Sequence, residues 1–273
     1  MEISEFLTRI DLKGSDGTLF KKEERKLTVL SGTEKKEEIR TGINIYTIFE
    51  NGSSAVTGFI IYDKGFPEDV FKVNPSLLKK ILEQTGNITL EGSFLVGHAP
   101  DGNIFEDIEP SKWRTINIKY NSKPIKISKD IITKILKRSE IIDPNKVTFI
   151  SDGQQMVITL YSKIGSSKSE LKFDCNVVVE AEPDVVTFFN ILDRIGDQDI
   201  NVYIDNTGQD RNKPIMIETS DKNSVISYFV MDIFDKEKEE AIKKKNKKEE
   251  PVEKAVEHEE ESDMTEEKLD LGL

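Results

Sequence analysis

The chain has 273 residues, which is enough for two modest domains that each bury a core. It is 36% hydrophobic and 33% charged. It contains no apolar run of about 20 residues, the length needed to span a bilayer. The net charge of −12 excludes a protein that coats nucleic acid over its whole surface, but it is compatible with one local basic face.

Cys175 is the only cysteine, which excludes an internal disulfide and fits a reducing compartment. Its strand-like surroundings predict a buried thiol rather than a nucleophile. The N-terminus shows no cationic segment followed by an apolar core, so we expect no export. These features together predict a cytoplasmic protein, or one in the cytoplasm of a host cell if the chain is viral.

The first predicted helix covers residues 1–11 and has Arg9 among its apolar residues. From Leu12 to Phe71 the sequence predicts strands and turns. Asn51-Gly52, between two alternating runs, is typical of a two-residue hairpin turn. The lysine- and glutamate-rich stretch 21–40 predicts a solvated hairpin, on which charge discourages stray strand pairing.

The second helix begins at Asn74-Pro75, where Asn74 is a cap and Pro75 suits the first helical position. Two lysines, Lys79 and Lys80, stand between two aliphatic pairs. Strands follow at 87–90, 93–96 and 113–120. A basic, proline-containing link at 120–127 marks a domain boundary.

The third helix covers residues 128–139, with Ser128 as its expected cap. Its aliphatic residues recur with helical spacing, which predicts one buried stripe. Three cations project from the other side: Lys134, Lys137 and Arg138. Strands at 146–150, 155–161 and 170–180 follow.

The fourth helix follows Pro183 and keeps the apolar pattern, but Phe189 and Asn190 replace the basic pair and leave Arg194 as its cation. Strands at 200–204, 214–218 and 225–234 complete this part of the chain. Four related helices at intervals of roughly 55 to 70 residues indicate one supersecondary unit used four times. Since each helix precedes a group of strands, we predict an α+β fold with antiparallel sheets and helices on one face.

Residues 236–273 contain 9 Lys against 14 Asp or Glu, a net charge of −5, and few apolar residues. This composition predicts an acidic tail that is disordered or transiently helical. The predicted organisation is therefore an N-terminal domain at 1–121, a C-terminal domain at 122–235 and a flexible tail at 236–273.

The layout of helices and strands in two domains resembles that of DNA sliding clamps. The stretch from Asn206 to Phe234, with KPIMIET and SVISYFVMDIF, resembles the ending of the proliferating-cell nuclear antigen type. The layout from Ser4 to Asp235, with the Asp101-Gly102-Asn103 turn, is similar to the T-even phage version. This resemblance covers roughly 230 residues and includes no catalytic motif.

The resemblance implies a head-to-tail homotrimeric ring around duplex DNA, with helices lining the hole and sheets forming the outer wall. Such a processivity factor would tether a replicative DNA polymerase, be opened by a clamp-loader ATPase and have no enzymatic activity or cofactor of its own. Its cations would attract phosphates without reading sequence, so that the ring can slide. The expected DNA-facing residues are Lys79, Lys80, Lys134, Lys137, Arg138, Arg9 and Arg194. The resemblance also implies an outer apolar pocket for partner peptides, with Tyr228, Val230 and Phe234 as candidates, although core packing is the expected role of any single one.

The chain ends in Lys268-Leu269-Asp270-Leu271-Gly272-Leu273, which is similar to terminal peptides that dock on the bacterial beta clamp. Lys268 stands where that pattern has Gln. Alternating leucines on a flexible end can enter an apolar groove, and a long tail provides reach. Leu269, Asp270, Leu271 and Leu273 are therefore the expected partner-binding residues of the tail.

The sequence has no phosphate-binding glycine loop, no cysteine pairs for zinc and no arrangement of carboxylates that predicts a metal site. His98, expected in a loop, and His258 in the tail do not form a catalytic set. We therefore expect a protein that is not an enzyme. Two alternatives remain open: a clamp-fold accessory protein that docks through its tail without encircling DNA, and a virion or scaffold protein.

Overall fold

The computed structural model describes residues 1–13, 15–31, 34–49, 54–62, 64–164, 167–196, 198–205 and 213–233. The chain divides into two units, Met1–Phe234 and Asp235–Leu273, and every described residue belongs to the first. The predicted tail and the Asn51-Gly52 turn lie outside the described residues. No helix in the described ranges is long and apolar enough to cross a membrane.

Four α-helices lie in the regions where the sequence predicts them: α1 Ile3–Ile10, α2 Pro75–Thr85, α3 Lys129–Ile142 and α4 Val185–Ile195. Asn74 caps α2, because its side-chain oxygen accepts from the N–H groups of Ser76 and Leu77 at 2.9 and 3.3 Å. The predicted hydroxyl cap of α3 is wrong: Ser128 holds the N-cap position, but its side chain accepts no capping bond. Instead the Asp199 carboxylate accepts the Lys129 N–H at 2.9 Å.

Along the chain, each helix is followed by a group of strands. The first half contains β1 Ser15–Ser31, β2 Glu34–Phe49, β3 Ala55–Ile61, β4 Phe71–Val73, β5 Ile88–Glu91, β6 Phe94–Ala99, β7 Gly102–Asp107 and β8 Glu109–Pro110. The second half contains β9 Ile125–Ile127, β10 Pro144–Asp152, β11 Gln155–Ser162, β12 Lys168–Asp174, β13 Val178–Ala181, β14 Ile200–Tyr203, β15 Ile215–Ser220 and β16 Ser224–Val230.

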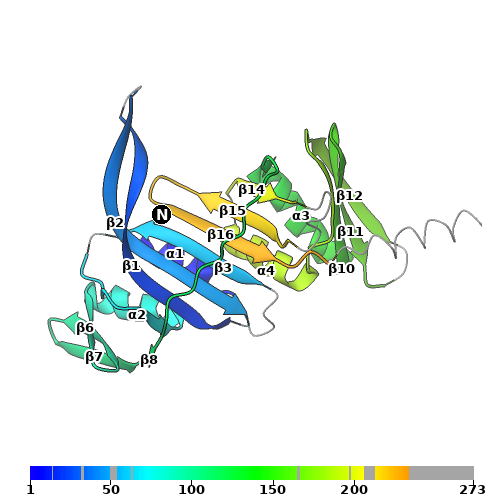
Figure 1. The fold of residues 1–273 in the computed structure, drawn as a ribbon. Helices are drawn as coiled ribbons and strands as arrows, with labels where there is room; N and C mark the ends of the chain where they lie inside the picture. The colour runs from blue at the N-terminus through cyan, green and yellow to red at the C-terminus, as the bar shows by residue number, and fades with distance from the viewer. Residues whose placement is uncertain are drawn as a thin grey trace, which may run out of the picture. The chain divides into compact units, whose positions relative to one another are not determined.

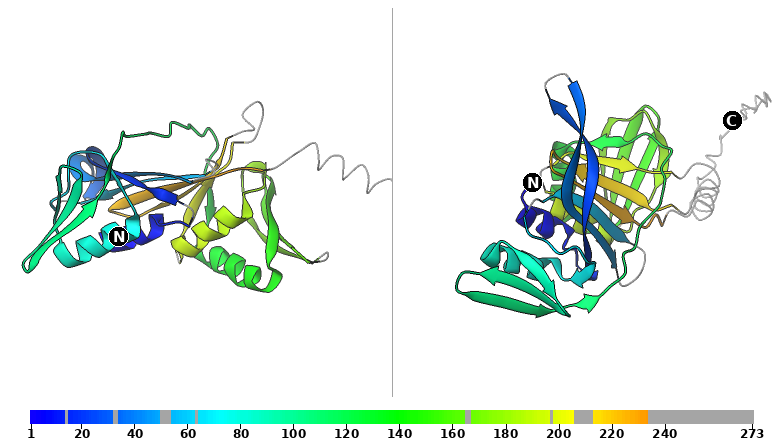
Figure 2. Two further views of the ribbon diagram at one scale, coloured as in Figure 1. Left: turned by 90° about the horizontal axis from the view of Figure 1, so that it is seen from below. Right: turned by 60° about the vertical axis from the view of Figure 1, so that its left-hand side comes forward.

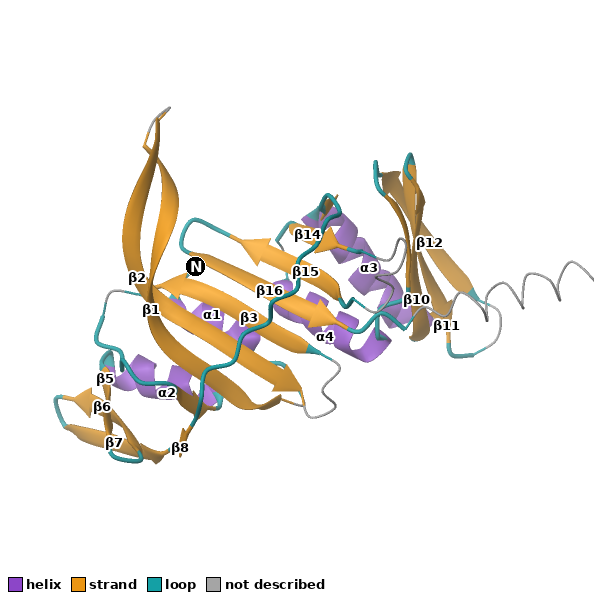
Figure 3. Ribbon diagram, viewed as in Figure 1, coloured by secondary structure: helices purple, strands orange, loops and turns teal. Residues whose placement is uncertain are grey.

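Among the described residues, all strand pairs are antiparallel and form three sheets (Figures 1 and 3). The nine-stranded sheet has the order β8-β4-β1-β2-β3-β16-β15-β14-β9. Strands of the two halves therefore join in one sheet, where β3 pairs with β16. The smaller sheets have the orders β12-β11-β10-β13 and β5-β6-β7.

The four helices lie in a row on one side of the nine-stranded sheet, in the order α2, α1, α4, α3 (Figure 2). Each helix turns its apolar side toward the strands: Phe6, Leu78, Ile132 and Phe188 are all at most 1% exposed. Burial of these side chains supplies the main favourable term that holds the helices in place. The arrangement confirms the predicted α+β class with helices on one face.

Some details of the prediction are wrong. Residues 113–120 form no strand but part of an extended connector, which crosses the nine-stranded sheet on the face opposite the helices (Figure 3). The predicted strand 170–180 is two strands, because β12 ends at Asp174 beside β11, whereas β13 begins at Val178 and pairs with β10. His98 lies in β6, not in a loop, and its Nε2 lies 2.7 Å from Thr89 Oγ1. The predicted boundary between 121 and 122 falls in the connector and stays a prediction.

The connector is held at both ends. Near its start, the Trp113 ring meets Tyr46 edge-on with ring centroids 6.4 Å apart. Near its end, the Tyr120 hydroxyl donates to the Pro214 carbonyl at 2.6 Å. The Asp205 carboxylate accepts the N–H groups of Asn121 and Ser122 at 2.7 and 2.8 Å.

The hairpin of β1 and β2 extends past its neighbours, since β4 pairs only with Thr18–Phe20 and β3 only with Gly42–Ile48 (Figure 1). At its base, the Arg25 guanidinium lies over the Phe59 ring, 4.6 Å from the centroid. Gly42 leaves room for that ring, because a Cβ at this position would lie 2.4 Å from it.

Candidate nucleic-acid interface

The cations of α2 are Lys79 and Lys80, which differ in exposure. Lys80 is exposed and makes no ion pair with any described residue. Lys79 is half-buried, and its Nζ donates to the Thr8 hydroxyl of α1 at 2.9 Å and lies 3.9 Å from Glu83. Lys80 is therefore free to attract a polyanion, whereas Lys79 is partly held by the neighbouring helix.

In α3, Lys134 and Lys137 are exposed and pair with no carboxylate among the residues the structure describes. Arg138 behaves differently. One of its terminal nitrogens donates to Ser169 Oγ at 3.0 Å and to the Glu170 carbonyl at 2.5 Å, so its guanidinium lies against β12. The three cations that the sequence groups together thus have two different environments.

Arg9 of α1 is 7% exposed, and its guanidinium forms an ion pair with Glu5 at 2.6 Å. Its second terminal nitrogen is buried and has no hydrogen-bond partner among the described residues. A buried and paired guanidinium has little surface to offer to a phosphate. Arg9 therefore packs within the fold and is not among the DNA contacts proposed for the exposed lysines.

Arg194 of α4 is half-buried and lies near Tyr228 of β16. Burial raises the pKa of Tyr228, while the positive charges of Arg9 and Arg194 act in the opposite direction. Both arginines are thus close enough to Tyr228 for their charges to act on its hydroxyl. The row of helices carries cations from α2 to α3, and the exposed ones are at its two ends.

The predicted tail residues Leu269, Asp270, Leu271 and Leu273 lie outside the described part of the chain, as does Phe234. The other two candidates for an outer pocket are core residues, which confirms the alternative role expected for each of them. Tyr228 and Val230 have 0% exposure, and the Tyr228 hydroxyl donates to the Arg9 carbonyl on the helix side of the sheet.

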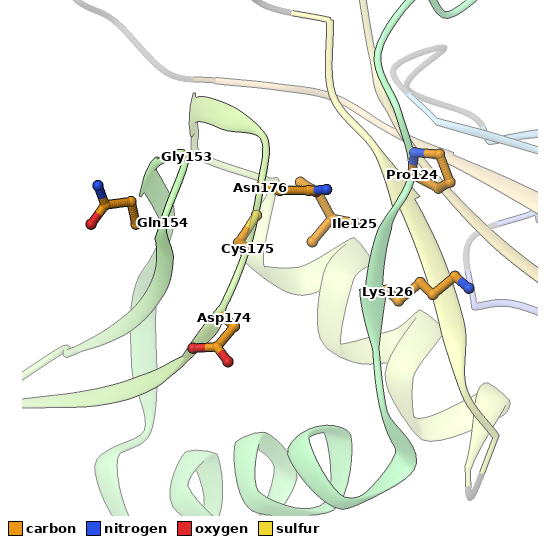
Figure 4. Close-up of a pocket in the computed structure, with 8 residues that line it drawn as sticks. All are labelled: Pro124, Ile125, Lys126, Gly153, Gln154, Asp174, Cys175 and Asn176. Carbon is orange, nitrogen blue, oxygen red and sulfur yellow. The ribbon is translucent and has the colours of Figure 1, made fainter.

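A cavity of about 470 Å³ lies between Pro124–Lys126 at β9 and the turns at Gly153–Gln154 and Asp174–Asn176 (Figure 4). Cys175, on its wall, is 8% exposed, which confirms the predicted buried thiol. No histidine lines this cavity to activate the thiol. In the described ranges, no group of three or more His, Cys, Asp or Glu side chains could hold a metal ion.

Two residues that the sequence did not single out form hydrogen bonds with residues far away in the chain. Thr8 holds Lys79 from a position 71 residues away, and Asp199 caps a helix that begins 70 residues earlier. Neither has a local sequence signal, because a hydroxyl or carboxylate at such a separation is indistinguishable from a surface residue until the fold is known.

No protein-family model matches the sequence, and no curated protein sequence matches it. Several solved structures match the fold of this chain. Proliferating cellular nuclear antigen from Entamoeba histolytica superposes with a TM-score of 0.60 at 12% identity, covering 85% of this chain and 96% of that one. The PCNA2–PCNA3 complex of Sulfolobus tokodaii gives 0.57 at 13% identity, with 85% and 97% covered. The beta subunit of DNA polymerase III from Thermotoga maritima gives 0.57 at 14% identity, with 87% of this chain and 65% of that chain covered.

These structures superpose on most of this chain, although few residues are identical. The chain has the fold of the DNA sliding clamps.

Proposed function

We propose that this protein is a sliding clamp that encircles duplex DNA and tethers a replicative DNA polymerase for processive synthesis. The observation that carries the proposal is the row of four helices on one side of the sheet, with exposed lysines on α2 and α3. Lys80, Lys134 and Lys137 are the main DNA-facing residues, with Lys79 and Arg194 in support. We propose domains at 1–121 and 122–235, each contributing two helices.

Sliding requires attraction without a sequence-specific trap. Lysine ammonium groups at the ends of flexible side chains attract phosphates from many positions and read no base edges. The protein would therefore hold DNA by topology and diffuse charge rather than by a tight site. No chemical step is required of it, so we propose a non-enzymatic role with no cofactor.

A ring needs two unpaired strand edges that can join. Both β7 and β12 are terminal strands of their sheets. Antiparallel residues alternate between hydrogen-bonded pairs and pairs whose N–H and C=O groups point away from the partner. Ile108 N–H donates to the Ser93 carbonyl at 2.8 Å, in line with the pairing of β6 and β7. Alternation then directs the backbone groups of Phe105 and Asp107 to the open edge.

The same argument applies to β12. Ser162 N–H donates to the Ser167 carbonyl at 3.0 Å, in line with the pairing of β11 and β12. The backbone groups of Lys168, Glu170 and Lys172 therefore point to the open edge.

One antiparallel register of β7 against β12 of a second copy satisfies both edges. It places Phe105 opposite Glu170, and it places Asp107 opposite the oppositely charged Lys168. On the core side it places Ile104 opposite Leu171, and Leu171 is buried at 7% exposure. Cross-strand pairs of opposite charge and of two apolar side chains both favour such a junction. Repeating this head-to-tail contact in a closed homotrimer would give six domains around the hole.

The proposed partners are duplex DNA, a DNA polymerase and a clamp-loader ATPase that opens the ring. The test is polymerase stimulation on primed circular DNA with the cognate loader and ATP. We expect longer products per binding event with the wild-type protein, and no gain with the Lys80→Glu/Lys134→Glu/Lys137→Glu variant. Absence of stimulation by the wild-type protein would contradict the proposal and favour the non-encircling accessory protein.

A further inference from the structure

Arg138 is the one cation of the predicted basic set on α3 that turns toward a strand instead of outward. It lies one helical turn after Lys134 and next to Lys137, both of which are exposed. Its guanidinium reaches Ser169 and Glu170 of β12, at 3.0 and 2.5 Å. The acceptor in Glu170 is the backbone carbonyl, so this hydrogen bond does not depend on the Glu170 side chain.

The position of that carbonyl follows from the ladder. At one end of the β11–β12 pair, Ser162 N–H donates to the Ser167 carbonyl at 3.0 Å. At the other end, Cys175 N–H donates to the Gln154 carbonyl at 3.0 Å, in the same register. Both ends assign the odd-numbered residues of β12 to hydrogen-bonded pairs, and the even-numbered residues then face the open edge. Arg138 therefore binds a carbonyl on the unpaired edge of the sheet.

A strand that adds to this edge needs the same carbonyl. In the register given above, the Phe105 N–H of a second copy would donate to Glu170. The guanidinium already donates to that oxygen at 2.5 Å, so the incoming N–H would have to share the carbonyl with it or displace it. We propose that Arg138 guards the open edge of β12, competing with the incoming strand for the Glu170 carbonyl until a second copy displaces it.

This inference rests on the proposed ring, because the incoming strand is β7 of another subunit. A charged side chain over an open edge discourages unspecific strand addition, a common protection of edge strands. The Ser169 hydroxyl holds the guanidinium in place from the core side of β12. Once displaced, the guanidinium would join Lys134 on the same side of α3, since residues four apart share a helix face.

The test is the concentration dependence of the mass of the full chain, measured by sedimentation for the wild type and Arg138→Ala. Removing the competitor should tighten the subunit interface, so that assembly occurs at about tenfold lower concentration. Ser169→Ala removes one of the two anchors and should shift assembly in the same direction by a smaller factor. Arg138→Lys should shift it in that direction too, because an ammonium lacks the planar fork that spans two acceptors.

Lys137→Ala is the matched control: it removes the neighbouring exposed cation of α3 while the Arg138 bonds to β12 stay in place, and it should leave assembly unchanged. If Arg138→Ala assembles at the same or a higher concentration than the wild type, the guard role is wrong. If wild type and variants all remain monomeric, the ring itself is contradicted. These two failures give different sedimentation patterns and cannot be confused.

Discussion

The Tyr228 hydroxyl donates to the backbone carbonyl of Arg9 at 3.2 Å, and thereby ties the last strand of the described chain to its first helix. Tyr228 is wholly buried in β16, and β16 pairs with β3, so this bond lies where the two halves of the chain meet. It also satisfies a carbonyl near the C-terminal end of α1, where helix carbonyls lack partners within the helix.

Tyr228→Phe keeps the ring but leaves that carbonyl without its donor. We expect the free energy of unfolding to fall by about 1 to 2 kcal/mol, measured by denaturant titration. Tyr161→Phe is the control, since the half-buried Tyr161 hydroxyl bonds to no described residue. An equal loss of stability in both variants would mean that the bond to Arg9 contributes nothing specific.

The exposed lysines of α2 and α3 should control the salt dependence of DNA binding. In the triple variant Lys80→Ala/Lys134→Ala/Lys137→Ala, the slope of log affinity against log salt should decrease by about 0.9 for each phosphate that is no longer neutralised. Lys146→Ala removes a lysine that is paired with Glu182 at 2.8 Å, and should leave the slope unchanged. Equal slopes for the triple variant and the wild type would show that these lysines do not face DNA.

The end of the connector should be sensitive to acid. Burial acts to raise the pKa of Asp205, but the hydrogen bond from the Asn121 N–H and others outweigh it, and the pKa lies below its ordinary value. A depressed folded pKa gives stabilisation that is complete above the unfolded value of about 3.9 and is lost as pH falls through the folded value. We expect the amides of Asn121 and Ser122 to exchange faster only in that acid range.

Asp205→Asn is the comparison for this prediction, because the group no longer titrates and its single amide oxygen can accept only one of the two N–H groups that the two carboxylate oxygens accept. We therefore expect faster exchange than in the wild type already at neutral pH. Hydrogen exchange at residues 121–122 should then lose its specific acceleration at low pH. If the variant and the wild type show the same acceleration, another group is responsible.

Gly42 should resist substitution. A Cβ there would lie 2.3 Å from the Ile60 carbonyl oxygen and 2.4 Å from the Phe59 ring. Gly42→Ala should therefore lower the free energy of unfolding by about 1 to 3 kcal/mol, because backbone cannot move aside as a side-chain tip can. Thr41→Ala, at the half-exposed neighbouring position, should cost less, and thermal unfolding can compare the two. A neutral Gly42→Ala would mean that β2 and β3 can separate locally.

The sequence predicts the helices well because their signals are local. Asn74-Pro75 marks the start of α2 through a cap and a fixed φ, and the buried residues Leu78 and Ile81 follow from helical spacing. It fails at Ser128, where a suitable hydroxyl is present but the distant Asp199 carboxylate is better placed. Residues 113–120 are predicted as a strand because of their composition. Whether a partner strand is available to pair with them is determined only by the fold.

The candidate interface shows the same contrast between features set by local sequence and features set by tertiary contacts. Helical spacing correctly groups Lys134 and Lys137 on an exposed side, but it cannot show that Arg138 reaches a strand 31 residues further along the chain. Nor can it show that Arg9 is buried, because its burial depends on the helices and strands that pack against α1 only in the folded chain. The direction in which a long and flexible cationic side chain points depends on its tertiary contacts, which the sequence does not show.

The most direct test of the central claim is topological. The protein is loaded onto a nicked circular plasmid with its loader and ATP, separated from free protein by gel filtration, and the plasmid is then cut once with a restriction enzyme. A ring predicts that protein stays with the circle, as a complex of three 31.1 kDa chains, and leaves when the DNA becomes linear. Equal retention on circular and linear DNA, or no retention on the circle, would contradict the account.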